Sequence, residues 1–317
     1  MTFKLVLLPP EYEPDWPARI REAVPDCQVV AAASLEDAAR ELADADAAFG
    51  TVPPELFARA KRLRWIAAAR AGLGRAWFYD ALVRSDVVVT GMHGAYNEHL
   101  SAHIVAFVLA FARRFDHYLP LQAQRLWRHD RTMIHLPDAT ALIVGVGGAG
   151  AEAGRLLAAF GVRVLGADPR VRQAPPGFAA LFPPDQLDAH LGEADFVIMT
   201  APETPQTLRL FDAARFARMK PGAYFINISR GTTVVTGDLL AALRSGRLAG
   251  AGLDVVDPEP LPADHPLWTT PGVLLTPHVA IFGARYKDRW LALLIENCRR
   301  FGRGEELLNV VDKQSWF

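Results

Sequence analysis

The sequence predicts two α/β domains in tandem, each built on a mainly parallel sheet that helices cover on both faces. Short apolar runs alternate with helical stretches through the first part of the chain, and a second alternating series begins at Ala141. A helical stretch over residues 97–126 separates the two series. With 317 residues, 51% of them hydrophobic, the chain has enough apolar material for two cores.

The first series contains short β-like runs and one clear helix start. Ser34 and Asp37 have the spacing of a helix-capping pair, so a helix is expected over residues 34–45. The strands are expected at residues 4–8, 28–32, 47–50, 65–69 and 87–90.

The second series follows the stretch over residues 97–126, which is rich in Ala, Leu, Phe and Arg and is expected to form one long helix that links the domains. A last amphipathic helix is expected over residues 284–301, and it returns the chain to the first domain. The strands of this series are expected at residues 141–144, 163–167, 196–201, 223–228, 250–255 and 273–276.

Charge and cysteine content exclude several classes of function. Lys plus Arg (34) nearly balance Asp plus Glu (35), so no overall field favours nucleic acid or an anionic membrane, and a small-molecule substrate fits better. Cys27 and Cys298 predict neither a disulfide framework nor a metal site, and a reducing cytoplasm is expected. The apolar run at residues 104–112 is too short to span a bilayer.

A glycine-rich turn carries the first functional signal. Gly145, Gly147 and Gly150 form G-x-G-x-x-G directly after the strand ALIV, and a helical run follows at once. The first glycine permits a tight turn, the second lets the backbone approach a pyrophosphate, and the third lets the helix pack on the strand. Gly148 and Ala149 lie at the start of that helix, whose amides face the phosphate charge. The turn predicts a dinucleotide site.

The choice of dinucleotide depends on the residues after the next strand. Asp168 ends that strand and is placed to accept hydrogen bonds from the adenosine ribose hydroxyls. A carboxylate there should repel the extra phosphate of NADP, so NAD(H) is favoured. Arg170 and Arg172 leave NADP(H) open, because either could reach a 2′-phosphate; a solvated loop is their other interpretation.

Moving a hydride between a nicotinamide and a carbonyl carbon needs a cation for the substrate's carboxylate, a proton donor for its oxygen and a group that tunes the donor. Arg230 follows one expected strand, Asp254 and Glu259 follow the next, and His278 follows the last. Open α/β sheets bind their ligands at these carboxyl ends. The four residues are therefore the candidates for the chemistry.

With these motifs the chain resembles the D-isomer-specific 2-hydroxyacid dehydrogenase family, in particular its glyoxylate/hydroxypyruvate reductase-like members. The resemblance is nearly unbroken from about Leu126 to Ala280 and weaker in the N-terminal part. It is carried by GVGGAG with Asp168, MKPGAYFINISRG (219–231), LAGAGLDVVDPEPLPADHPLW (248–268), LLTPHVA (274–280) and NVVDK (309–313).

The resemblance implies two flavodoxin- or Rossmann-like doubly wound domains with the active site in a cleft between them. Arg230 would bind the substrate's carboxylate and carbonyl oxygen, a bidentate task that suits a guanidinium. His278 would be the general acid/base, and Glu259 would orient its imidazole and let the ring carry a proton near neutral pH. Asp254 would support them near the nicotinamide, and Pro202 and Thr207 would contact the cofactor.

In the first domain, ARAGLG at residues 69–74 resembles the family loop whose backbone amides meet the substrate carboxylate. Leu73 and Gly74 would contribute the amides, with Gly72 allowing the turn. The family's Asp shortly after this loop is missing, since Arg75 and Ala76 stand there, and a plain structural turn is the alternative. Residues 1–97 plus 284–317 are expected to bind substrate, and residues 98–283 to bind NAD(P).

Three aromatic or imidazole side chains stand near these loops. Tyr96 and His93 are expected to shape the substrate pocket, with packing at the hinge as the alternative for Tyr96. Trp127 matches a family tryptophan, and it would line the cleft, join a subunit contact or simply pack. His265 has no such support and is interpreted as a loop residue.

The leading hypothesis is NAD(H)-dependent reduction of a 2-keto acid to the D-2-hydroxy acid, with glyoxylate, hydroxypyruvate or a bulkier 2-keto acid as substrate. A homodimer that pairs through the helical stretch at residues 97–126 is expected. The alternative is a dinucleotide-sensing interaction protein of the corepressor kind without turnover, which the intact set of Arg230, Glu259 and His278 disfavours. Formate or phosphite oxidation is also disfavoured, because HVAIFGARYKDRW lacks the extra pocket residues.

Overall fold

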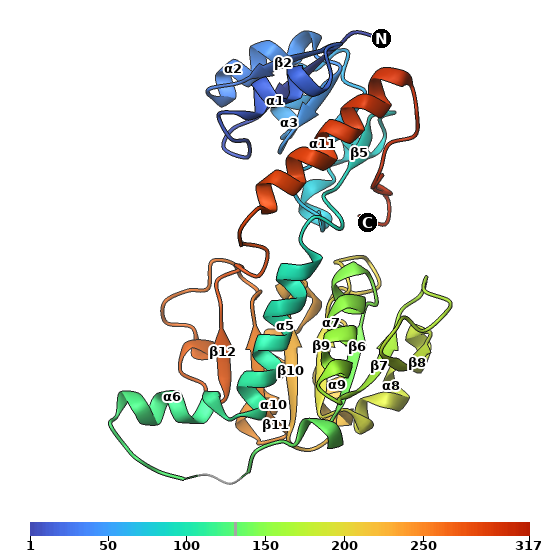
Figure 1. Ribbon diagram of the computed structural model, residues 1–317. Coiled ribbons are helices and arrows are strands. Elements are labelled where there is room, and N and C mark those ends of the chain that lie inside the picture. The colour runs from blue at the N-terminus through green and yellow to red at the C-terminus, as the bar shows by residue number, and fades with distance from the viewer. Residues whose placement is uncertain (130–131) are drawn as a thin grey trace. The chain divides into compact units, whose positions relative to one another are not determined.

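The computed structural model describes residues 1–129 and 132–317, and this chain divides into two compact units. The discontinuous unit consists of Met1–Ala95 and Gly283–Phe317, and the central unit of Tyr96–Phe282. Each unit is built on a parallel sheet with helices on both sides (Figure 1). The predicted fold class, with two doubly wound α/β sheets, is confirmed.

The discontinuous unit contains a five-stranded sheet in the order β2-β1-β3-β4-β5. All its strand pairs are parallel, and the order is that of flavodoxin-like folds. The strands are β1 (Phe3–Leu7), β2 (Cys27–Ala31), β3 (Ala47–Phe49), β4 (Trp65–Ala67) and β5 (Val88–Thr90), and the helices are α1 (Trp16–Ala23), α2 (Leu35–Glu41), α3 (Pro54–Phe57), α4 (Asp80–Val83) and α11 (Tyr286–Arg303).

Alternation along β1 divides the core of this unit into two layers. Val6 and Leu8 point to the layer that α2 covers. On the other face, aromatic rings join the sheet to α1 and α11: Trp16 lies 5.2 Å from Phe49, and Phe301 lies 5.4 Å from Trp65. The C-terminal helix is therefore part of this core, as its apolar periodicity predicted.

The central unit contains a seven-stranded parallel sheet in the order β12-β11-β10-β9-β6-β7-β8. Strand order reverses between β6 and β9, which makes the carboxyl ends of these two strands the switch point where doubly wound sheets bind ligands. The strands are β6 (Thr140–Val144), β7 (Arg163–Ala167), β8 (Phe178–Phe182), β9 (Phe196–Met199), β10 (Ala223–Asn227), β11 (Leu248–Leu253) and β12 (Val273–Leu275).

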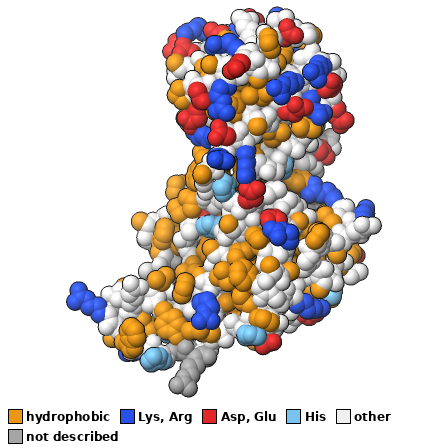
Figure 2. Space-filling view, in the orientation of Figure 1, with side chains coloured by type: hydrophobic (Ala, Val, Ile, Leu, Met, Phe, Trp, Pro, Cys, Tyr) orange, Lys and Arg blue, Asp and Glu red, His pale blue; other side chains and the backbone are white. Residues whose placement is uncertain are grey.

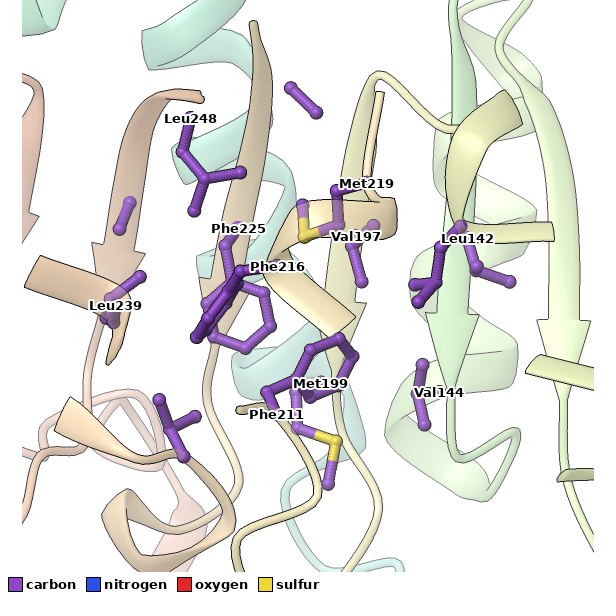
Figure 3. Close-up of a cluster of buried hydrophobic side chains, with 14 of the residues drawn as sticks. Leu142, Val144, Val197, Met199, Phe211, Phe216, Met219, Phe225, Leu239 and Leu248 are labelled. Atoms are coloured by element: carbon purple, nitrogen blue, oxygen red, sulfur yellow. The ribbon is translucent and has the colours of Figure 1, made fainter. Parts of the chain in front are cut away.

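Helices cover both faces of this sheet (Figure 1). One face packs on α5 (Asn97–Ala112) and α7 (Gly148–Ala159). The other packs on α8 (Leu187–His190), α9 (Ala213–Arg218) and α10 (Thr236–Arg244), where the rings of Phe211 and Phe225 lie 4.7 Å apart in the cluster of Figure 3. Because strands between two helical layers are buried on both sides, β6, β9 and β10 are buried along their whole length and mostly apolar.

Glycines let α5 lie close to β11. A Cβ atom at Gly252 would be 2.8 Å from the ring of Phe107. A Cβ atom at Gly250 would be 3.2 Å from the ring of Phe111 and 2.4 Å from the carbonyl oxygen of Gly272. Both contacts are tighter than a side chain allows, so GAG at residues 250–252 fixes how closely this helix approaches the strand.

The prediction of one long helix over residues 97–126 is wrong. The chain forms two helices, α5 and α6 (Phe115–Ala123), because Arg114 between them adopts a left-handed backbone conformation with φ 60°. A helix cannot continue through such a residue. Strand β8 was also not predicted, since FAALF lacks the β-branched residues that marked the other strands.

Within the described residues, no helix is long and apolar enough to cross a membrane.

Candidate active site

The glycine turn joins β6 to α7 at the switch point, and its three glycines have different surroundings. Gly145 has φ 97°, and a Cβ atom there would lie 2.4 Å from the backbone nitrogen of Ala201. At Gly150 a Cβ atom would lie 2.2 Å from the carbonyl oxygen of Gly145. These two positions need glycine for the fold itself.

Gly147 differs, because a Cβ atom there would meet nothing within 4 Å. Its φ of −76° suits any residue, so the fold leaves this position open. Gly147 caps helix α7, and the first backbone hydrogen bond of the helix runs from Ala151 to its carbonyl. The amides of Gly148, Ala149 and Gly150 therefore have no acceptor within the helix, as at helix starts that bind phosphate, and phosphate binding here stays a prediction.

Asp168 follows β7, and the backbone amides around it bind its carboxylate. Oδ2 accepts a hydrogen bond from the amide of Val146 at 2.9 Å. Oδ1 accepts from the amides of Arg170, at 2.8 Å, and Val171, at 3.1 Å. Three of the roughly four acceptor positions of a carboxylate are thus filled, and the residue is 5% exposed. These amides fix the loop around Asp168, and hydrogen bonds from an adenosine ribose to its carboxylate stay a prediction.

The loop after β9 contains Pro202 and Thr207. The Thr207 hydroxyl donates to the carbonyl of Pro202 at 2.6 Å and accepts from the amide of Thr204 at 2.8 Å. These bonds close the loop on itself, beside the glycine turn that Ala201 contacts. Contact between this loop and a cofactor stays a prediction.

Arg230 lies in the turn that follows β10, and the side chain of Asn227 holds this turn. Asn227 Nδ2 donates to the carbonyl of Arg230 at 3.0 Å, while Oδ1 accepts from the amide of Ser229 at 3.0 Å and from its hydroxyl at 3.1 Å. Asn227 is 1% exposed, whereas the Arg230 guanidinium is half-buried and donates to the Ser229 carbonyl. The sequence interpretation overlooked Asn227, although a polar residue at the end of a buried strand was a usable signal.

The turn with Arg230 touches the loop with Glu259. A Cβ atom at Gly231 would lie 1.8 Å from the carbonyl oxygen of Val256, so only glycine allows this approach. The amide of Val256 in turn donates to Glu259 Oε1 at 3.0 Å. Two loops from neighbouring parallel strands are therefore in direct contact.

Glu259 binds the candidate acid/base residue. Its Oε2 lies 2.9 Å from His278 Nδ1, and both side chains are accessible, at 38% and 37% exposed. Because an ionised carboxylate only accepts hydrogen bonds, the geometry assigns a proton to Nδ1. The ring's other nitrogen, Nε2, then remains for an external partner.

His278 has φ 53°, a left-handed conformation that costs a non-glycine residue about 1 to 3 kcal/mol. Asp254, which is 2% exposed, supplies the bonds that hold it there. The Asp254 carbonyl accepts from the His278 amide at 2.8 Å, and its carboxylate accepts from the amides of Val279, at 2.9 Å, and Ala280, at 3.0 Å. Contact between Asp254 and a nicotinamide stays a prediction, since the partners that the structure gives it lie in the His278 loop.

A histidine on α5 also reaches this loop. His103 Nε2 lies 2.9 Å from Thr276 Oγ1, and Thr276 Oγ1 donates to Asp254 Oδ1 at 2.6 Å. Burial lowers the pKa of His103, and the nearby Asp254 carboxylate opposes this shift. The sequence did not single out His103 or Thr276, because they come together only through the packing of α5 on β11.

The predicted substrate residues are divided between the two units. Leu73 is buried in the discontinuous unit, and Gly74 follows it with φ 71° at the start of a 3-10 helix (Arg75–Trp77). Tyr96 is 5% exposed and immediately precedes α5 in the central unit. Their contact with substrate stays a prediction.

The other singled-out side chains have separate surroundings. The ring of His93 meets Phe317 edge to face at 5.1 Å, and His265 Nδ1 accepts from the amide of Leu267 at 3.3 Å. Trp127 is 92% exposed. Among residues 1–129 and 132–317, no three His, Cys, Asp or Glu side chains group to hold a metal ion.

Sheet order and glycine turn together define the class of the protein, an α/β protein of the dinucleotide-binding kind. The family model for the D-isomer specific 2-hydroxyacid dehydrogenase NAD binding domain matches residues 105–280. Glyoxylate/hydroxypyruvate reductase A of Serratia proteamaculans is 33% identical over 284 residues, which cover 84% of this chain and 85% of that protein.

Two solved structures have the same fold over the full length of both chains. A D-isomer specific 2-hydroxyacid dehydrogenase from Xanthobacter autotrophicus, in complex with NADPH, has a TM-score of 0.87 and 30% identity. An NADPH-dependent glyoxylate/hydroxypyruvate reductase from Sinorhizobium meliloti, in complex with NADP, has the same two values. The chain belongs to the D-isomer-specific 2-hydroxyacid dehydrogenase family, and it is an NAD(P)-dependent oxidoreductase.

Gly147→Ala should weaken dinucleotide binding about tenfold or more, because the added methyl group would stand where the pyrophosphate is expected. The melting temperature should stay within a few degrees, because the methyl group meets no protein atom within 4 Å. Gly145→Ala should instead destabilise the fold by more than about 1 kcal/mol, because of its φ of 97° and the clash with Ala201. Fluorescence titration and thermal unfolding measure both effects.

Gly237→Ala is the matched control, because a Cβ atom there also meets nothing within 4 Å and the position lies on α10. It should change neither quantity. Wild-type affinity in Gly147→Ala would contradict the assignment of the phosphate position.

Burial of His103 predicts a pH effect on stability. The folded state resists protonation of this ring, so the pKa of His103 lies below its ordinary value of 6.5. The free energy of unfolding therefore decreases as the pH falls below 6.5, and His103 has no such effect at pH values well above 6.5. We expect the melting temperature of His103→Gln to fall less than that of the wild type between about pH 7 and pH 5. Equal slopes in thermal unfolding would contradict this.

Proposed function

We propose that the chain reduces a small 2-keto acid to the D-2-hydroxy acid with a nicotinamide dinucleotide, and that glyoxylate and hydroxypyruvate are its substrates, with a bulkier 2-keto acid as a third candidate. The observation that carries this proposal is the His278–Glu259 pair, 2.9 Å apart, in which the loop of Glu259 contacts the Arg230 turn through Val256 and Gly231. The relatives named as glyoxylate/hydroxypyruvate reductases support the choice of substrate.

The bound cofactor supplies the hydride that arrives at the carbonyl carbon. The Arg230 guanidinium binds the carboxylate and the carbonyl oxygen of the substrate, and its fixed fork orients both groups. His278 Nε2 gives a proton to the carbonyl oxygen, and in the reverse direction it takes the proton from the hydroxyl. Glu259 holds the ring through Nδ1 and stabilises its charged form.

The two units have separate tasks in this proposal. Residues 98–283 bind the dinucleotide, through Gly145, Gly147, Gly148, Ala149 and Gly150 and the loop with Pro202 and Thr207. Residues 1–97 plus 284–317 bind the substrate, and the amides of Leu73 and Gly74 meet its carboxylate. Tyr96 lines the pocket. Gly74 is buried, and its positive φ turns the backbone at the end of this segment, as in turns whose backbone amides bind anions.

The proposed catalytic pair predicts that His278→Gln lowers kcat about 10²- to 10⁴-fold, the range that a general acid contributes. Glu259→Gln should lower it less, since the ring remains but loses its charged partner. NADH and NADPH oxidation with glyoxylate and hydroxypyruvate measures both effects. His135→Gln, which changes an exposed histidine paired with Asp138, is the control. Wild-type turnover by His278→Gln would overturn the assignment.

The dinucleotide preference depends on the loop after β7. NAD(H) was the expectation, because the Asp168 carboxylate repels a 2′-phosphate; in the structure three backbone amides hold this carboxylate against its own loop. Arg170 and Arg172 are exposed on the same loop. We therefore propose that NADPH binds at least as well as NADH, in keeping with the NADP(H) bound to two of the similar structures.

Replacing both Arg170 and Arg172 with Ala should weaken NADPH binding about tenfold or more and leave NADH binding within about twofold, because a charge-assisted hydrogen bond contributes roughly 1.5 to 3 kcal/mol. Isothermal titration measures both dissociation constants. Arg155→Ala removes an exposed arginine of α7 and serves as the control. If the double variant binds NADPH like the wild type, these arginines do not read the phosphate.

We also propose that the protein is a homodimer that pairs through α5 and α6. Hydrophobic side chains gather on the face of the central unit that carries these helices (Figure 2), and Phe115 and Leu119 are 53% and 55% exposed. Helix α5 has no Lys, Arg or Asp, which is unusual for a helix with one face in water. Light scattering at micromolar concentration should give the mass of two chains, and a monomer would contradict the proposal.

The cytoplasm is the proposed location, in keeping with two buried free cysteines.

A further inference from the structure

A chain of side-chain hydrogen bonds runs from helix α5 to the loop with His278. His103 on α5 lies 2.9 Å from the Thr276 hydroxyl, which lies 2.6 Å from Asp254 Oδ1. Asp254 then binds the amides of Val279 and Ala280, on the far side of His278. These bonds connect α5 to the loop of the proposed acid/base residue.

The direction of each bond in this chain follows from the chemistry of the groups. An ionised Asp254 carboxylate only accepts hydrogen bonds, so the single hydroxyl proton of Thr276 points to Oδ1. The Thr276 oxygen must then accept from His103, and Nε2 of that ring carries the proton. The lowered pKa of His103 agrees with a neutral ring that has its one proton on this nitrogen.

The first residue of this hydrogen-bonded series, His103, packs against the sheet through Phe107. His103 meets the ring of Phe107 edge to face at 4.8 Å, and Phe107 packs on Gly252 in β11, only two residues before Asp254. The Asp254 amide itself donates to the carbonyl of Asn227, whose side chain holds the Arg230 turn. The Asp254 backbone thus bonds the strand beside it, while its carboxylate bonds Thr276 and the His278 loop.

We propose that His103 and Thr276 are positioning residues, which fix the Asp254 carboxylate so that it holds His278 in its left-handed conformation. The proposal rests on the proposed function of His278 as the acid/base. Without the Thr276 hydroxyl, the Asp254 carboxylate keeps its two backbone donors but loses the side-chain donor that fixes its rotation. The His278 imidazole then shifts relative to Glu259, and proton transfer suffers while substrate and dinucleotide binding do not.

The test compares Thr276→Val, which keeps the shape and removes the hydroxyl, with Thr276→Ser, which keeps the hydroxyl. We expect Thr276→Val to lower kcat about ten- to a hundredfold, as misplacement of a catalytic group does, with KM and the dinucleotide dissociation constant within about twofold. Thr276→Ser should recover kcat to within about threefold. Thr270→Val is the control, since it removes a hydroxyl that bonds only the Pro266 carbonyl.

His103→Leu should resemble Thr276→Val, and the double variant should lose no more than Thr276→Val alone, because the two residues act through one chain. Unchanged kcat in Thr276→Val, equal losses in the Val and Ser variants, or fully additive losses in the double variant would each overturn the proposal.

A second readout separates this proposal from the proposed function. In ¹⁵N-labelled protein, the ring nitrogens of His103 should show the proton on Nε2, and Thr276→Val should shift the ring signals of His278 while Thr270→Val leaves them unchanged. If the wild type turns over no 2-keto acid, the proposed function fails. The ring signals still show whether His103 and Thr276 position His278. A proton on Nδ1 of His103, or unshifted His278 signals in Thr276→Val, would overturn it.

Discussion

The buried carboxylate of Asp254 is the group on which the proposed acid/base loop depends. It accepts hydrogen bonds from the Thr276 hydroxyl and from the amides of Val279 and Ala280, and its backbone carbonyl accepts from His278. A charge buried to 2% exposure is costly unless each oxygen has donors, and here the donors come from the loop that it positions. The same hydrogen bonds therefore offset the cost of burying the Asp254 carboxylate and stabilise the left-handed conformation of His278.

Asp168 is a second buried carboxylate whose donors come from the loops that it positions. Its carboxylate binds one backbone amide after β6 and two after β7, so it ties the glycine turn to the loop that carries Arg170 and Arg172. An acidic residue at this position is usually interpreted as a residue that binds the ribose of the dinucleotide. In this chain it fixes the backbone of the loop that carries the two arginines proposed to bind a 2′-phosphate.

Sequence patterns predicted much of this arrangement, for identifiable reasons. The glycine spacing, the apolar strands and the positions of Arg230, Glu259 and His278 after successive strands follow from local rules of doubly wound sheets. Three features did not follow. The break at Arg114 depends on a single φ angle within an apolar stretch, the saturation of Asp168 depends on the path of its loop, and His103 meets Thr276 only because Gly252 lets α5 approach β11. The first two depend on the local path of the backbone, and the third on a contact between residues far apart in the sequence.

The central claim is that this site moves a hydride to the C2 atom of a 2-keto acid and gives a proton to its oxygen. The most direct measurement uses NADPH and NADH carrying deuterium at the transferred position, with hydroxypyruvate and bulkier 2-keto acids as substrates. Chiral chromatography and mass spectrometry then identify the product. The account predicts the D-2-hydroxy acid with one deuterium at C2. The L-enantiomer, a product without deuterium, or no product from any of these acids would contradict it.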